Sequence, residues 1–150
     1  MEETLDLAKR SAEVSHNSQE GIEGTHAIAA AIFLARTGQS KQEIKKYIED
    51  NFGYDLDKTV AEHRATRSKN YVCSQSGPEA IRCWLEADTY EQTIRNAVAL
   101  CTDADTVADI AGAIAAATPG MEVPLEWADR VFDMLDDELK EIFIDFHNNL

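Results

Sequence analysis

The sequence predicts an all-α protein that folds as one compact multi-helix bundle, a single helical domain over residues 1–150. Apolar residues recur at helical spacing along most of the chain, and this period indicates amphipathic helices. Glycine and proline number only 7 and 3, so breaks between helices are few. Hydrophobic residues make up 44% of the 150 residues, which is enough for the core of one domain.

The first two helices follow from this spacing and from one stop signal. Leu5, Ala8 and Ala12 share one face of a first helix. A second helix is expected over residues 22–36. Gly38 marks its end, because glycine favours the left-handed conformation that terminates helices.

A third helix is expected to begin with a capping box. Ser40 is placed to accept a hydrogen bond from the backbone of Glu43, whose side chain can reach back to the start of the helix. The apolar face of this helix carries Ile44, Tyr47 and Ile48.

Residues 64–77 interrupt the helical pattern. They show no clear period, and their serines and glycine indicate a loop, with a short extended piece over residues 71–73. The next helix is expected after Pro78. The basic side chains of this loop are those of Arg64, Arg67 and Lys69. They either bind the diphosphate of a ligand or are solvated surface charges, and both interpretations remain open.

Five helices follow Pro78 and bring the expected total to about eight. Thr89 caps the second of the five. The helix over residues 103–117 is rich in alanine, and small side chains let neighbouring backbones approach closely, so we place it at the centre of the bundle. The other apolar residues expected to face the core are Ile81, Trp84, Leu85, Ile94, Ala97, Val98, Trp127, Val131, Leu135, Leu139, Ile142 and Phe143.

The charge of the chain argues against nucleic acid as a partner. The 28 acidic residues outnumber the 14 basic ones, for a net charge of −14. A field of this sign repels a phosphate backbone. It also repels any anionic ligand unless a local positive charge, such as a bound divalent cation, offsets it.

The chain has the features of a reduced cytoplasmic protein. Its three cysteines form no Cys-x-x-Cys pair. The N-terminus is acidic and lacks the apolar run of a signal peptide. No apolar stretch is long enough to span a membrane, so no membrane partner is expected.

The segment Asp103-Ala104-Asp105-Thr106 is the strongest candidate for chemistry. It offers three oxygen donors where a loop enters an apolar helix, and Mg²⁺ prefers oxygen ligands. The alternative is structural, because Asp and Thr are favoured at helix N-caps and acids in a first turn complement the helix dipole. The apolar body of the helix favours the first reading, since it suggests that the acidic start points into a crevice.

Several segments together resemble the ADP-ribosylglycohydrolase family in order and spacing. They are residues 76–81, 84–86, 94–98 and 103–115, with Ser15-His16, Gly21-Ile22 and Tyr54-Asp55-Leu56 upstream. The resemblance covers about residues 8–140 and implies the helical fold of that family.

The resemblance also implies a site and a reaction. Asp103, Asp105 and Thr106 would supply one side of a two-ion Mg²⁺ site, half of the ligands, which holds the distal ribose of ADP-ribose. Asp105 is the preferred catalytic residue, accepting a proton from the attacking water in hydrolysis of the glycosidic bond between ADP-ribose and a modified protein or other acceptor. The other residues expected to contact the ligand are His16, Ser74, Ser76 and Gly77.

One part of the family pattern has no counterpart in the sequence. The Gly-rich acidic element and the Thr-Asp-Asp element of the family's N-terminal part are absent, so we expect a C-terminal portion of the family fold. Homo-oligomer formation or pairing with an N-terminal half would follow. A non-catalytic module that binds ADP-ribose or a partner, and a helical domain without a site, remain the alternatives.

The other histidines are expected to be structural. His26 falls in an apolar helix and should be buried with a hydrogen-bond partner. His63 and His147 are expected at the surface.

Overall fold

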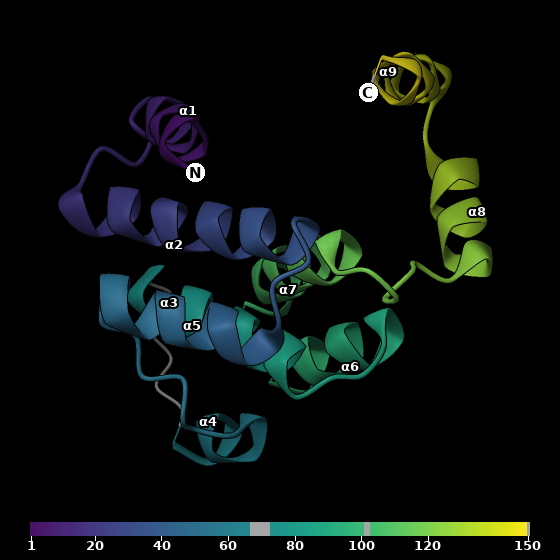
Figure 1. Cartoon of the computed structure of the whole chain (residues 1–150). Coiled ribbons are helices and arrows are strands. Elements are labelled where there is room, and N and C mark those ends of the chain that lie inside the picture. Colours follow the sequence, from purple (N-terminus) through teal and green to yellow (C-terminus); the bar gives the residue numbers. More distant parts are fainter. Residues whose placement is uncertain (67–72, 101–102, 150) are drawn as a thin grey trace.

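The computed structural model describes residues 1–66, 73–100 and 103–149, without the side chains of Cys73 and Ser74. These residues form nine helices and no strand, which confirms the all-α prediction (Figure 1). The helices are α1 Glu2–Ala12, α2 Gln19–Arg36, α3 Lys41–Phe52, α4 Val60–Thr66, α5 Cys73–Leu85, α6 Tyr90–Leu100, α7 Ala104–Ala117, α8 Leu125–Met134 and α9 Asp137–Asn148.

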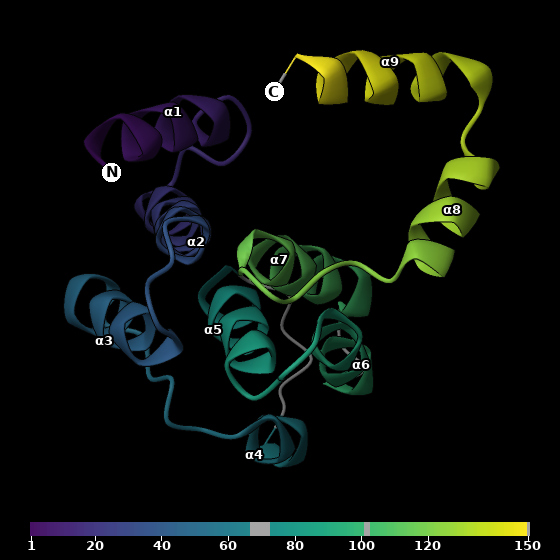
Figure 2. The ribbon, with the colours of Figure 1, turned by 45° about the vertical axis from the view of Figure 1, so that its right-hand side comes forward.

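Helix α7 lies at the centre of the bundle, as its small side chains predicted. It packs against α2, α5 and α6 (Figure 2). Val107, Ala111 and Ile114 are fully buried on it. At Gly112 an added Cβ atom would lie 3.0 Å from Cδ1 of Ile94, so the absence of a side chain is what lets α6 and α7 approach.

The start signals of α3 and α6 are confirmed. The Ser40 hydroxyl accepts from the N–H of Glu43, and a Glu43 carboxylate oxygen accepts from the N–H of Ser40 at 2.8 Å. The Thr89 hydroxyl accepts from the N–H of Gln92 at 3.1 Å. These signals are local, because they need only residues within one turn of each other.

Trp84 is fully buried at the junction of α3, α5 and α7. Its indole N–H donates to the hydroxyl of Thr118 at 2.9 Å. The ammonium of Lys41 lies over the indole ring and donates to the carbonyl oxygens of Trp84, at 2.9 Å, and of Ala87. These bonds tie the start of α3 to the C-terminal end of α5, where helix carbonyls lack intrahelical donors.

Helix α5 begins earlier than the sequence predicted. It starts at Cys73, so the expected loop up to Gly77 and the extended conformation at residue 73 are wrong, and Pro78 stands inside the helix. Residues 67–72, and with them Arg67 and Lys69, lie outside the described residues. Gly77 has no Cβ atom to clash with the ring of Pro78, so the chain can stay helical through this pair.

Helix α4 was not predicted from the sequence. Arg64, predicted to open the loop, lies in the last turn of α4. Thr59 stands directly before α4, and its hydroxyl and N–H both donate to the carboxylate of Glu62, at 2.7 and 2.8 Å. This pairing stabilises the start of a short helix that lacks a long apolar face.

The last two helices are amphipathic but their apolar side chains are exposed. The prediction of a core position is wrong for Val131, Leu139, Ile142 and Phe143, which are 60%, 49%, 58% and 54% exposed. It is also wrong for Val98, on α6, which is 53% exposed. In both views α8 and α9 stand away from the bundle (Figures 1 and 2). The periodic pattern showed which face is apolar but not what covers it.

Two histidines differ from their predictions. The side chain of His63 is only 14% exposed, with Nδ1 3.9 Å from the carboxylate of Glu79, so it is not a surface residue. Nε2 of His26 is buried and has no hydrogen-bond partner among the described residues, so the expected partner is absent there. His147 is exposed as predicted.

Two further features bear on how the chain behaves in solution. Cys83 is a buried thiol on α5, and burial is the main reason that its pKa is raised to about 12. Within residues 1–66, 73–100 and 103–149, none of the helices has the length and apolar character needed to cross a bilayer.

Candidate metal and ligand site

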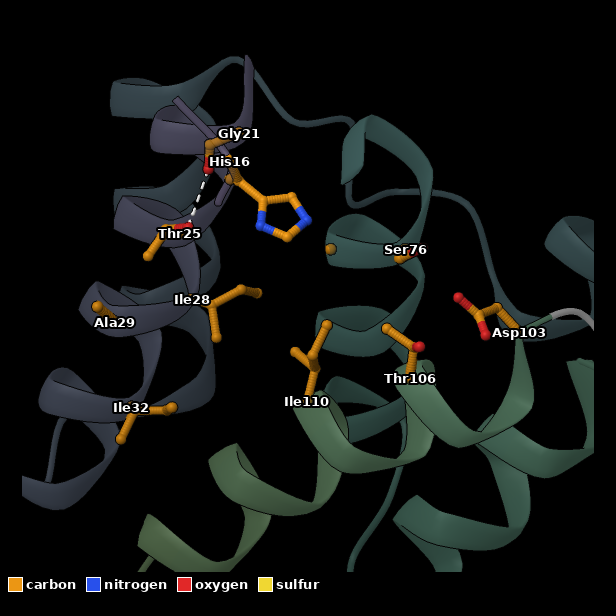
Figure 3. A pocket seen from close by; sticks show the side chains of 12 residues that line it. His16, Gly21, Thr25, Ile28, Ala29, Ile32, Ser76, Asp103, Thr106 and Ile110 are labelled. Carbon is orange, nitrogen blue, oxygen red and sulfur yellow. Dashed lines mark hydrogen bonds between the residues drawn. The ribbon is translucent and has the colours of Figure 1, made fainter. Parts of the chain in front are cut away.

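A cavity of about 580 Å³ lies between α2, α5 and the start of α7 (Figure 3). Five residues that the sequence singled out line it together, although they come from three separate parts of the chain. They are His16, Ser76, Gly77, Asp103 and Thr106. The volume is within the range of sites that take a drug-sized ligand.

Asp103 and Thr106 enter the cavity from the N-terminal end of α7. Asp103 is the N-cap residue, and its backbone carbonyl accepts from the N–H of Val107 at 2.9 Å. Its carboxylate makes no capping hydrogen bond. In Figure 3 the carboxylate of Asp103 and the hydroxyl of Thr106 both point toward the space beside Ser76. The backbone therefore caps the helix while the side-chain oxygens remain directed at the cavity.

Asp105 adjoins this pair but does not line the cavity. It is exposed at the surface of the first turn of α7. Its pKa is lowered, first by a hydrogen bond with the Asp103 carboxyl group and then by the N–H groups of Thr106 and of Asp105 itself. The two carboxyl groups are thus close enough to interact, at a helix end whose open N–H groups favour negative charge.

His16 reaches the cavity from the turn between α1 and α2. Nδ1 lies 2.8 Å from the hydroxyl oxygen of Ser15. The imidazole ring points toward α5 (Figure 3). Its opposite nitrogen, Nε2, is therefore the one left for a ligand.

Ser76 and Gly77 belong to the beginning of α5 rather than to the loop that was predicted for them. Gly77 is buried, and a Cβ atom there would lie 3.2 Å from the hydroxyl oxygen of Tyr54. The close contact with Tyr54 leaves little room for a side chain at this position. Ser74 is part of α5, but its side chain lies outside the described residues, so its predicted contact with a ligand stays a prediction.

The apolar wall of the cavity was missed by the sequence analysis. It is formed by Ile28 and Ile32 on α2 and Ile110 on α7 (Figure 3). The side chain of Thr25, next to them, donates its hydroxyl to the carbonyl of Gly21 at 2.9 Å. Spacing of three and four residues along α2 could have indicated this face, but the pattern does not distinguish a cavity wall from a packed core.

The donor chemistry suits a hard cation. Asp103, Asp105 and Thr106 provide oxygen ligands from one turn, and Mg²⁺ is usually bound by one or two carboxylates together with water and substrate oxygens. Among the described residues there is no group of three or more His, Cys, Asp or Glu side chains that could hold a metal ion. The oxygen donors among the described residues therefore suit one side of a magnesium site, but they do not form a complete set of protein ligands.

Comparison with known proteins agrees with the resemblance seen in the motifs. The family model described as ADP-ribosylglycohydrolase matches residues 1–149. Searches of curated proteins and of solved structures give no significant match.

Proposed function

Because the chain belongs to the ADP-ribosylglycohydrolase family, we propose that it serves in magnesium-dependent hydrolysis of the bond between ADP-ribose and a modified protein or other acceptor. The observation that supports this proposal is the meeting of His16, Ser76, Gly77, Asp103 and Thr106 around one cavity. The sequence predicts a metal or ligand contact for each of these residues. A purely structural role for Asp103 would not require its carboxylate to face a cavity.

The reaction places positive charge on the ribose. Cleavage at the anomeric carbon passes through an oxocarbenium-like transition state, which nearby carboxylates stabilise. Asp103 and Thr106 would hold Mg²⁺ on the cavity side, and Asp105 would hold it from the outer side of the same turn. When bound, Mg²⁺ supplies a Lewis acid that orients the ribose hydroxyls and offsets the negative charge of the chain.

Asp105 is the proposed general base. An exposed aspartate is ionised at neutral pH, as a group that accepts a proton must be. Its exposed position allows water to reach it. The ribose would lie between Asp103 and Ser76, with the apolar part of the ligand against Ile28 and Ile110.

The remaining ligands of the cation are proposed to come from a partner segment. The described residues supply oxygen donors from a single turn of α7. A segment with the Gly-rich acidic and Thr-Asp-Asp elements of the family would face this turn across the cavity and complete the site. Affinity for Mg²⁺ should therefore be weak without that segment, because few protein oxygens hold the ion.

Titration calorimetry tests the proposal directly. ADP-ribose is titrated into the chain with and without MgCl₂, and release of ADP-ribose from an ADP-ribosylated peptide is followed by chromatography. The double variant Asp103→Ala/Asp105→Ala should lose the Mg²⁺-dependent part of the binding. The matched control is Asp129→Ala/Asp133→Ala, which removes the same charge from exposed positions on α8. Equal binding by all three proteins would exclude a metal role for the α7 turn.

A non-catalytic binding module is the second candidate. It is favoured by the position of Asp105, because only one carboxylate of the motif, that of Asp103, lines the cavity. In this case the chain would bind ADP-ribose and release none from the modified peptide, with or without MgCl₂. Time-dependent release above that of the Asp103→Ala/Asp105→Ala variant would rule this candidate out.

A further inference from the structure

His16 does not belong to a helix, and its position is fixed by the hydrogen bonds of the turn in which it lies. It lies in the turn that connects α1 and α2, where its N–H donates to the carbonyl of Ala12 at 2.7 Å. The N–H of Ser15 donates to the same carbonyl at 3.0 Å. These two bonds close the turn at the end of α1 and fix the backbone from which the imidazole reaches the cavity.

The turn packs against Gly21, where the absence of a side chain leaves room for the backbone of His16. A Cβ atom at Gly21 would lie 2.7 Å from the carbonyl oxygen of His16 and 3.2 Å from its Cβ atom. The clash would be with backbone, which cannot swing aside as the end of a side chain can. Gly21 itself cannot move easily, because its N–H donates to the Ser18 hydroxyl at 3.0 Å and its carbonyl accepts from Thr25 at 2.9 Å. Any larger residue at position 21 must therefore displace the turn that carries His16.

Ser15 acts on the imidazole itself. Its hydroxyl oxygen lies 2.8 Å from Nδ1 of His16. In a neutral imidazole one nitrogen carries the proton and the other accepts, and the hydrogen bond made at one nitrogen decides the state of the other. A serine hydroxyl that donates to Nδ1 places the imidazole proton on Nε2, on the side of the cavity.

We propose that Ser15 and Gly21 are positioning residues for His16, which then donates from Nε2 to an oxygen atom of the ligand. The proposal rests on the proposed function, because the ligand is taken to be ADP-ribose. Its hydroxyl, ring and phosphate oxygens can all accept a hydrogen bond. His16 approaches from the turn before α2 while Asp103 and Thr106 approach from the start of α7, so the ligand is held from two sides (Figure 3).

The tautomer of His16 provides a test that needs no ligand. Nitrogen chemical shifts of the imidazole are measured in the ¹⁵N-labelled chain at mildly alkaline pH, and the His16 signals are assigned by their loss in His16→Gln. We expect the Nε2–H form in the wild type and in Ser15→Thr, which keeps the hydroxyl, and a shift toward the Nδ1–H form in Ser15→Ala. An Nδ1–H form in the wild type, or the same ratio of forms in Ser15→Ala, would overturn the role of Ser15.

The affinity for ADP-ribose tests the consequence for binding. Loss of one hydrogen bond to the ligand should weaken affinity by about 3-fold to 10-fold in Ser15→Ala, with recovery in Ser15→Thr. Ser11→Ala, at an exposed position of α1, is the control and should bind like the wild type. Gly21→Ala should weaken binding at least as much as Ser15→Ala, and unchanged binding would refute the steric role of Gly21.

The two tests separate this proposal from the proposed function. A wild type that does not bind ADP-ribose contradicts the proposed function, while the tautomer measurement still decides whether Ser15 orients His16. If Gly21→Ala fails to fold, Ser15→Ala and Ser15→Thr still test the positioning of His16, because Ser15 is an exposed residue.

Discussion

The backbone of Gly112 approaches Tyr90 so closely that a Cβ atom added to the glycine would lie 3.1 Å from the tyrosine hydroxyl oxygen. This contact joins α7 to the start of α6. Alanine is favoured over glycine in a helix by about 1 kcal/mol, and overpacking costs about 1–3 kcal/mol, so Gly112→Ala should lower the free energy of unfolding by about 0–2 kcal/mol. Urea unfolding followed by circular dichroism measures the change. Ala113→Ser, at the exposed neighbouring position, should change stability by no more than about 0.5 kcal/mol.

Lys41 should contribute more to stability than other lysines of α3. Lys41→Met removes the donor to the carbonyl oxygen of Ala87 and one of the two donors to that of Trp84, whose other donor is the N–H of Ala87, at a cost of about 1–3 kcal/mol. Lys46→Met is the control, because Lys46 pairs with Asp50 on the surface of the helix. Thermal unfolding of both variants compares them. Equal melting temperatures would show that solvent replaces the Lys41 bonds without cost.

The stability of the protein should depend on the titration of His63. Its pKa is lowered, first by burial and also by Lys58 and Arg82, although Glu79 and Asp55 act in the opposite direction. The unfolded chain then binds a proton more readily than the folded one. His63 thus favours folding above its ordinary pKa of about 6.5, and this contribution is lost as the pH falls below that value.

The His63 variant tests this dependence. The free energy of unfolding of His63→Gln should fall less steeply than that of the wild type between about pH 7 and pH 5. His147→Gln, at an exposed position of α9, should keep the wild-type slope. The comparison of slopes cancels the titration of the many carboxylates that all three proteins share.

The hydroxyl of Thr106 should matter for ligand binding in the presence of Mg²⁺. Thr106→Val keeps the shape of the side chain and removes its oxygen, so affinity for ADP-ribose should fall by about 3-fold to 10-fold. Thr106→Ser retains the oxygen and should bind nearly as well as the wild type. Calorimetry with and without MgCl₂ gives both values. A Thr106→Val variant that binds as the wild type would remove Thr106 from the proposed site.

The exposed faces of α8 and α9 should cause self-association. Leu125 is 81% exposed and Phe146 is 66% exposed, and apolar patches of this kind favour contact with another protein surface. Light scattering should show a mass that rises with concentration in the wild type and that of a monomer in Ile142→Glu/Phe146→Glu. Glu138→Gln/Glu141→Gln, on the same helix, changes the charge by the same amount in the opposite direction and should leave the self-association in place. A wild-type mass that stays that of a monomer would contradict the expectation.

The sequence predicted well what is determined locally. The capping box of Ser40 and Glu43 and the Thr89 cap of α6 depend on neighbours in the chain, and both were confirmed. Features that depend on distant contacts were missed. Pro78 suggested a boundary, yet α5 begins before it, in a segment where Gly77 packs against Tyr54.

The candidate site was predicted by its motifs rather than by its physical pattern. Asp103 and Thr106 could be singled out as oxygen donors, but only the resemblance to a family indicated that His16 would lie near them. Ile28 and Ile110 were not predicted as cavity residues. The spacing of apolar residues along a helix is the same whether they line a cavity or pack against another helix.

The buried thiol of Cys83 can serve as a probe of local opening of the helix bundle. With its pKa raised to about 12, the thiol is protonated at neutral pH and shielded by the helices around it. An alkylating reagent can modify it only when α5 separates from those helices. The rate at which the peptide containing Cys83 gains the label, measured by mass spectrometry, would therefore give the frequency of that separation and show whether bound ADP-ribose slows it.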